Sequence, residues 1–167
     1  MKTVLFVRHA KSSWKFPDLT DFQRPLNKRG LRDAPVMGKR LRKRGMFPDL
    51  IISSPAVRAY TTAKFIAKEV GYKPKAIQQE QKVYEASRET VLNILRQLPN
   101  DKNIVFIFGH NQTFTTLANY FSDDYIDNVP TSGMVAVNFD IDKWKDLSQK
   151  NSHFSFFDYP KLGLYMI

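Results

Sequence analysis

Short apolar runs alternate along the chain with segments whose apolar residues recur at helical spacing. The runs are rich in β-branched and aromatic side chains, which favour buried strands. We predict strands over residues 1–7, 50–53, 104–108 and 134–139, a minor strand over 76–79 and a last strand over 154–159. The polar residues 8–26, which include two prolines, are predicted to form a loop.

Helical spacing predicts four helices between these strands. They cover residues 28–44, 55–70, 88–98 and a segment through Leu117 and Tyr120, and three have suitable N-capping residues in Asn27, Ser54 and Ser87. Ser54 is followed by Pro55, and proline is favoured at the first helical position. Pro35 should interrupt the first helix, because proline fits a first turn better than an interior, and Asp33 would then cap a second segment.

Alternating strands and helices predict a mostly parallel sheet with helices on both faces. We find no repeat, linker or low-complexity stretch that would divide the chain, and we predict a single three-layer α/β/α domain over residues 1–167. In such sheets, functional groups gather at the carboxyl ends of the strands. The residues that directly follow each strand are therefore the first candidates for a functional site.

The composition limits the compartment and the chemistry. Hydrophobic residues make up 43% of the chain, as in soluble globular proteins, and no apolar stretch approaches the ~20 residues of a membrane span. The chain has no cysteine, so disulfides and thiolate chemistry are excluded. Residues 1–7 lack the cleavage site of a signal peptide. We expect a cytoplasmic protein without a membrane partner.

Positive charge is in excess. Lys and Arg number 26 against 16 Asp and Glu, a formal charge of +10, which favours anionic partners such as nucleic acid, an acidic membrane surface, or phosphorylated metabolites and proteins. Part of the excess lies in GKRLRKRG, residues 38–45, which is either a solvated helix face or a binding surface. No recognition element or set of stacking aromatic residues accompanies it, so we expect no nucleic-acid partner.

Four residues should meet at one edge of the predicted sheet. Arg8 and His9 follow the first strand, His110 follows the strand over 104–108, and Arg58 lies in the first turn of the helix after residues 50–53. Arginine binds phosphate oxygens through parallel charge-assisted hydrogen bonds, and a neutral imidazole can attack phosphorus in line. This cluster predicts a phosphoryl-transfer site in which His9 becomes a phosphohistidine that water then cleaves.

Each of these residues also has a plainer interpretation. Arg8 and Arg58 could be solvated charges, and His9 and His110 could be structural histidines or metal ligands. A metal site is the weaker alternative, because no third histidine lies close in sequence and the nearby loop carboxylates lack a recognisable ligand spacing. We expect neither a metal ion nor a cofactor.

Five segments, in this order, carry a resemblance to a known family: FVRHAKSSW, RPLNKRG, LIISSPAVRAYTTA, VYEAS and FGHN. Over roughly residues 2–139 the chain resembles the histidine phosphatase superfamily, and most of all its small SixA-like branch of phosphohistidine phosphatases. The resemblance implies a phosphoglycerate mutase-like fold, His9 as the nucleophile, and Arg8, Arg58 and His110 as ligands of the phosphoryl oxygens. Ala10 stands where larger members have glycine.

The resemblance also suggests supporting residues. Lys11 and Ser12 would add phosphate donors. Glu85, in VYEAS, stands about where many members place the acid that protonates the leaving group. Alternatively, Glu85 interacts with the positive N-terminus of the next helix.

The resemblance implies a metal-independent phosphohydrolase. It points to phosphohistidine on a signalling protein, such as a histidine-phosphotransfer domain, as the substrate. A small phosphoester is the alternative substrate, although the limited length of inserted sequence favours an open site that a protein surface can reach. The alternative from another functional class is a non-catalytic module that binds phosphate or nucleic acid.

Overall fold

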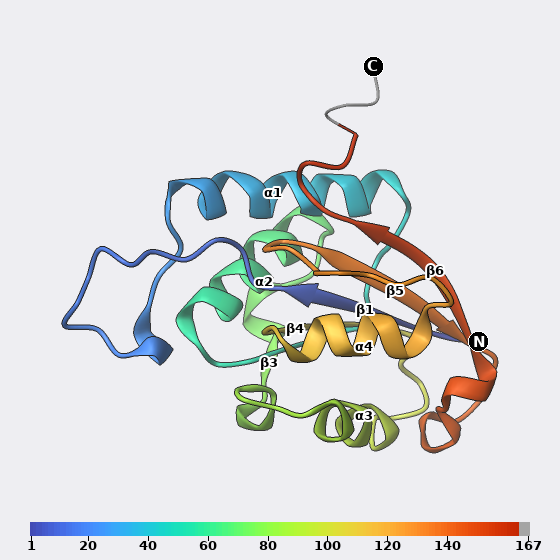
Figure 1. Ribbon diagram of the computed structural model, residues 1–167. Helices are drawn as coiled ribbons and strands as arrows, with labels where there is room; N and C mark the ends of the chain where they lie inside the picture. Colours follow the sequence, from blue (N-terminus) through green and yellow to red (C-terminus); the bar gives the residue numbers. More distant parts are fainter. Residues whose placement is uncertain (164–167) are drawn as a thin grey trace.

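The fold is built on a six-stranded sheet, shown in Figure 1. The computed structural model describes residues 1–163. The sheet contains, in the order β3-β2-β4-β1-β5-β6, the strands β1 (Lys2–Arg8), β2 (Leu50–Ser53), β3 (Gln78–Gln79), β4 (Ile104–Gly109), β5 (Met134–Phe139) and β6 (Ser152–Asp158). All predicted strands are present, although the minor strand is only two residues long because a 3-10 turn occupies Pro74–Ala76.

All strands except β5 run in the same direction. β1 pairs in parallel with β4, β4 with β2, and β2 with β3. β5 is antiparallel to both β1 and β6, so β6 points the same way as β1. The prediction of a mostly parallel sheet is confirmed, and the carboxyl ends of β1, β2 and β4 lie at one edge.

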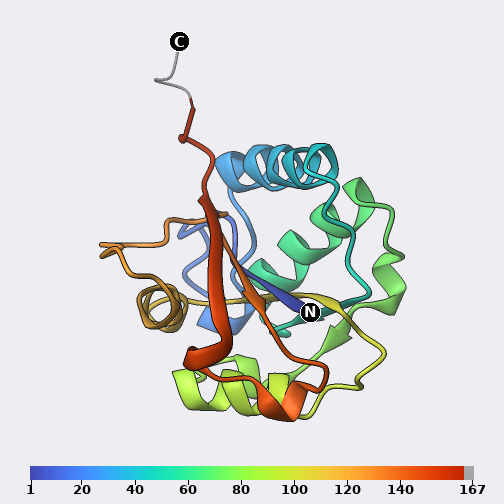
Figure 2. The same ribbon diagram turned by 90° about the vertical axis from the view of Figure 1, so that its right-hand side faces the viewer.

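Helices cover both faces of the sheet, which confirms the three layers. They are α1 (Lys28–Lys43), α2 (Val57–Glu69), α3 (Arg88–Arg96) and α4 (Thr113–Phe121). The side chains of successive β1 residues point to opposite faces of the sheet. Val4 and Phe6 share a core cluster with α3 and α4, whereas Leu5 and Val7 share one with α1 and α2. Figures 1 and 2 show this division. Among residues 1–163, no helix has the length and apolar character needed to cross a bilayer.

Helix α1 is continuous, so the predicted interruption at Pro35 is wrong. Asp33 does not cap a second segment; its buried carboxylate instead accepts a hydrogen bond from Arg32 Nε at 3.1 Å. A proline inside a helix costs about 3 kcal/mol. Burying Met37 and Leu41 completely contributes about 1.5–3 kcal/mol for each side chain, which offsets that cost.

Two of the three predicted caps are confirmed. Asn27 and Ser87 cap α1 and α3, each accepting a hydrogen bond from the backbone N–H three residues later. Ser54 does not cap a helix that starts at the next residue, because α2 begins only at Val57. The Ser54 hydroxyl instead accepts a hydrogen bond from the Ala56 N–H at 3.2 Å. This bond stabilises the turn between β2 and α2 and keeps the hydroxyl at the sheet edge.

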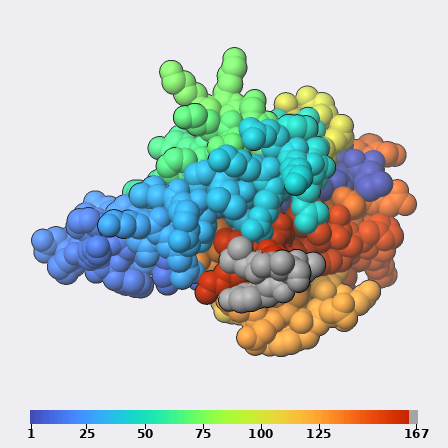
Figure 3. All heavy atoms as spheres, turned by 90° about the horizontal axis from the view of Figure 1, so that it is seen from above, coloured from blue at the N-terminus to red at the C-terminus, as the bar shows by residue number. Residues whose placement is uncertain are grey.

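The loop between β1 and α1 borders the same edge. Figure 3 shows this segment, coloured blue, projecting from the rest of the molecule. At the base of the loop, Ser12 and Leu26 form an antiparallel bridge. Gly30 allows the loop to pass close to α1, since a Cβ at this position would lie 2.2 Å from the carbonyl oxygen of Lys11.

We predict that Gly30→Ala lowers the free energy of unfolding by about 1–3 kcal/mol, because the added methyl group must displace the loop. Helix propensity alone predicts the opposite sign, since alanine is favoured over glycine by about 1 kcal/mol. Urea unfolding measures the change, with Leu31→Ala at the neighbouring exposed position as the control. Stabilisation by Gly30→Ala would show that the loop does not lie close to α1.

Candidate active site

The pairing of β1 with β4 places two histidines next to each other at the sheet edge. Arg8 is opposite Gly109 in the register, so His9 and His110 leave neighbouring strands side by side, with ring centroids 5.3 Å apart. The charges of Arg8 and Arg58 act on both rings. The structure thus brings together the four residues predicted from the sequence, and we refer to Arg8, His9, Arg58 and His110 as the cradle.

His9 is held as a neutral ring with a defined tautomer. Its Nδ1 lies 2.7 Å from the carbonyl oxygen of Ala10. Because a carbonyl oxygen only accepts, Nδ1 carries the proton and Nε2 keeps its lone pair. Burial lowers the pKa of His9 to about 3, although the hydrogen bond to Ala10 acts in the opposite direction. His9 is therefore neutral at physiological pH.

His110 is oriented by Ser54, whose hydroxyl lies 2.8 Å from His110 Nε2. This hydroxyl already accepts from the Ala56 N–H, so its own hydrogen can be donated to Nε2, which favours a proton on Nδ1. Burial, and to a smaller extent the charge of Arg58, lower the pKa of His110 to about 4. The neutral ring can then donate a hydrogen bond from Nδ1. Sequence patterns assigned Ser54 to a helix cap and missed this contact.

Three buried side-chain atoms have no hydrogen-bond partner among the described residues: Arg8 Nε, His110 Nδ1 and Ser132 Oγ. Ser132 belongs to the same edge, because its N–H donates to the carbonyl oxygens of Arg8 and His9, both at 3.1 Å. It adopts a left-handed φ of 62°, a conformation that is costly for a residue with a side chain. Since buried polar atoms are nearly always paired, this cluster is suited to bind an external polar group.

Asp21, which the sequence did not single out, fixes Arg58. Arg58 donates from Nη1 to the Asp21 carbonyl oxygen at 2.6 Å and from Nη2 to its carboxylate at 2.9 Å. The carboxylate also accepts from the Tyr84 hydroxyl at 2.7 Å and from Arg24 at 3.0 Å. Partial burial favours a higher pKa for Asp21, but the hydrogen bonds from Tyr84 and Arg58 lower it to about 2. The carboxylate is therefore ionised when it holds Arg58.

Tyr84 and Glu85 are neighbours in VYEAS, but only the tyrosine contacts the cradle. The Tyr84 ring meets the His110 ring edge to face, at a centroid distance of 5.5 Å. Glu85 is exposed, with a left-handed φ of 59°. No hydrogen bond joins the Glu85 side chain to another residue within 1–163, and Ser87 caps the helix that follows. The role of Glu85 as an acid stays a prediction.

Lys11 and Ser12 belong to a hydrogen-bonded part of the loop. The buried Ser12 hydroxyl accepts from Arg24 Nη2, and Arg24 Nε also donates to the Ser13 carbonyl oxygen at 3.2 Å. The carbonyl oxygen of Lys11 accepts from the Asn27 N–H at 2.9 Å. These bonds fix the backbone beside the cradle, and the roles of Lys11 and Ser12 as phosphate donors stay predictions.

Within residues 1–163, no group of three or more His, Cys, Asp or Glu side chains could hold a metal ion.

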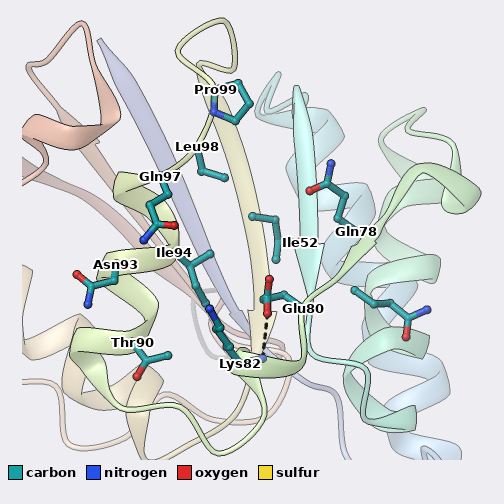
Figure 4. A pocket seen from close by; sticks show the side chains of 11 residues that line it. Ile52, Gln78, Glu80, Lys82, Thr90, Asn93, Ile94, Gln97, Leu98 and Pro99 are labelled. Carbon is teal, nitrogen blue, oxygen red and sulfur yellow. Dashed lines mark hydrogen bonds between the residues drawn. The ribbon is translucent and has the colours of Figure 1, made fainter.

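A pocket of about 480 Å³ lies apart from the cradle, between α3 and the edge strand β3, as Figure 4 shows. In its wall, the Glu80 carboxylate accepts a hydrogen bond from the Lys82 N–H at 3.1 Å. None of the site residues predicted from the sequence lines this pocket.

The lowered pKa of His9 makes stability depend on pH. Below about pH 6.5 an unfolded His9 binds a proton, whereas the folded residue stays neutral down to about pH 3, so acid favours the unfolded state. Between pH 7 and pH 5 we predict that the wild type loses about 2 kcal/mol more stability than His9→Gln. Urea unfolding at both pH values measures this difference. Equal losses would show that the folded His9 ring binds protons as readily as the unfolded one.

Comparisons of the sequence with known proteins identify a family model that covers Arg8, His9 and Arg58, and a relative that matches most of the chain. Residues 4–87 match the family model of the histidine phosphatase superfamily, branch 1. An uncharacterised protein of Mycobacterium leprae is 26% identical over 167 residues, which span 93% of this chain and 100% of that protein.

Solved structures share the whole architecture. A SixA protein of Agrobacterium tumefaciens, named as a phosphohistidine phosphatase, is 28% identical with a TM-score of 0.80, covering 95% of this chain and 98% of its own. The protein histidine phosphatase SixA with bound tungstate is 19% identical with a TM-score of 0.79, covering 95% and 97%. A mycobacterial glucosyl-3-phosphoglycerate phosphatase is 14% identical with a TM-score of 0.69, covering 95% and 100%. The last two likenesses are of fold alone. The chain belongs to the histidine phosphatase superfamily and is a SixA-like phosphatase.

Proposed function

We propose that this protein hydrolyses phosphorylated substrates through a covalent phosphohistidine on His9, without a metal ion. The hydrogen bond from His9 Nδ1 to the Ala10 carbonyl carries the proposal, because it leaves the Nε2 lone pair on a neutral ring. Nε2 attacks phosphorus as the bond between phosphorus and the leaving group breaks. Water then attacks the phosphohistidine, which releases phosphate and returns the electron pair to Nε2.

The other cradle residues would hold the phosphoryl oxygens. Arg8 Nε and His110 Nδ1 are buried and have no partner within residues 1–163, so both are available as donors to phosphoryl oxygens. Arg58 reaches the same place from α2, oriented by Asp21. Donors that are fixed and desolvated before the reaction stabilise the developing negative charge without reorganising.

We propose phosphohistidine on a signalling protein, such as a histidine-phosphotransfer domain, as the substrate. An imidazole whose ring is already protonated leaves as a neutral group, so it needs little help from an acid. This suits a site in which the Asp21 carboxylate beside the cradle is ionised and Glu85 is exposed. A small phosphoester, whose alkoxide is a poor leaving group, would depend on Glu85 as the acid. The family match favours either enzyme over the non-catalytic binding module.

We expect His9→Ala to lose at least about a thousandfold of the turnover of para-nitrophenyl phosphate, because no other residue replaces the nucleophile. The wild type should be unaffected by EDTA and inhibited by vanadate, as measured by nitrophenolate release. His153→Ala is the matched control, since His153 is exposed on β6 away from the cradle. Turnover that persists in His9→Ala would exclude His9 as the nucleophile.

Asp21→Asn should weaken anion binding, because Arg58 loses its ionic partner. Hydrogen bonds to charged groups contribute about 1.5–3 kcal/mol. Since the carboxylate is 52% exposed, we expect the lower end, a roughly tenfold higher KM and equally weaker vanadate inhibition, with a smaller change in kcat. Asp18→Asn, on the same loop, is the control.

Steady-state kinetics with para-nitrophenyl phosphate and vanadate separates two roles of Asp21. Weaker vanadate binding in Asp21→Asn supports a carboxylate that positions Arg58 for the anion. Tighter vanadate binding would instead show that Asp21 competes with the anion for Arg58.

A further inference from the structure

Three large apolar side chains are exposed on the loop between β1 and α1. Trp14, Phe16 and Leu19 are 76%, 51% and 37% exposed. Figure 3 shows the segment before α1 projecting from the rest of the molecule. Single exposed apolar residues are ordinary, whereas a group of them on one projecting segment marks an interaction surface.

Trp14 is held in place although its ring is exposed. The guanidinium carbon of Arg24 lies 3.3 Å from the centroid of the indole ring, which is a cation–π contact. Arg24 also bonds to the Asp21 carboxylate, and Asp21 bonds to Arg58 of the cradle. The ring is therefore presented at a set position relative to the cradle. A partner that covers a fixed ring pays little in lost side-chain freedom.

Positive charge borders the exposed apolar group. Lys15 lies between Trp14 and Phe16 in sequence, and Lys28 begins α1 at the base of the loop; both are exposed. No ion pair joins either lysine to a carboxylate in the described part of the chain. Asp18 offsets one of these charges locally, but the chain as a whole carries +10. An acidic partner surface is therefore favoured over a basic one.

We propose that Trp14, Phe16 and Leu19 form a docking surface for a folded phosphorylated protein whose phosphohistidine is surrounded by apolar and acidic side chains. The inference rests on the proposed function and narrows the substrate to an intact protein domain. A small metabolite bound in the cradle gains nothing from apolar residues on a projecting loop. A phosphohistidine on a domain surface brings its neighbouring side chains against that loop.

The test compares one phosphoryl group in two contexts. An acidic histidine-phosphotransfer domain phosphorylated on its histidine is one substrate, and the free amino acid phosphohistidine is the other. We expect the combined variant Trp14→Ser/Phe16→Ser to lose at least about tenfold of kcat/KM on the domain and less than about twofold on free phosphohistidine. Phe16→Ser alone retains the Trp14–Arg24 contact. It should lower kcat/KM on the domain by a smaller factor and again leave free phosphohistidine nearly unaffected.

Phe47→Ser is the matched control. Phe47 is 50% exposed, nearly the same as Phe16, but it precedes β2 and so lies at the amino edge of the sheet, opposite the cradle. The Phe47→Ser variant should keep the wild-type kcat/KM on both substrates. Lys15→Glu should lower kcat/KM on the acidic domain alone, and added salt should reduce that difference.

Other outcomes would overturn the docking surface. Equal losses on both substrates would place the effect in the cradle rather than in protein recognition. A wild type that hydrolyses free phosphohistidine as efficiently as the domain would leave the loop without a role, although the proposed function would survive. A wild type that cleaves para-nitrophenyl phosphate but neither phosphohistidine substrate would overturn the proposed substrate together with the docking surface.

Discussion

The parallel pairing of β1 with β4 fixes the position of the two histidines. His9 and His110 are neighbours because Arg8 lies opposite Gly109. That register is set by the core, since alternate residues of β1 serve opposite faces of the sheet. A slip of one residue would turn the Phe6 side chain toward α1 and α2. The side chains of β1 would then no longer fit either core cluster. The geometry of the cradle is thus a consequence of hydrophobic packing several residues away.

The same burial determines the charge state of the cradle. Two guanidinium groups and two imidazoles lie close together at the sheet edge, and both rings stay neutral because burial and the neighbouring positive charges disfavour protonation. The role of nucleophile that we propose for His9 requires this neutrality. The Asp21 carboxylate supplies the compensating negative charge from the loop. The neutral ring costs stability at low pH, and at neutral pH it is in the form that the proposed nucleophile needs.

The sequence predicted what depends on local pattern. Buried parallel strands appear as apolar runs, so the strand ends that carry His9 and His110 could be placed before the structure. Asp21 was missed because its partners are far along the chain, 37 residues away at Arg58 and 63 at Tyr84, and no local spacing marks such contacts. The prediction at Pro35 was wrong for the reverse reason. The local preference of proline for a first turn was outweighed by packing of the buried face of α1.

The loop before α1 contacts the cradle and also carries the proposed docking surface. Through Arg24 and Asp21 it orients Arg58, and Arg24 also contacts the exposed Trp14 ring, so one segment connects the cradle to an exposed aromatic side chain. The strand ends cannot vary without disturbing the core, whereas exposed residues of a projecting loop can. Under the proposed docking surface, a change of protein substrate would therefore fall at exposed loop positions such as Phe16, while His9 and His110 stay where the sheet holds them.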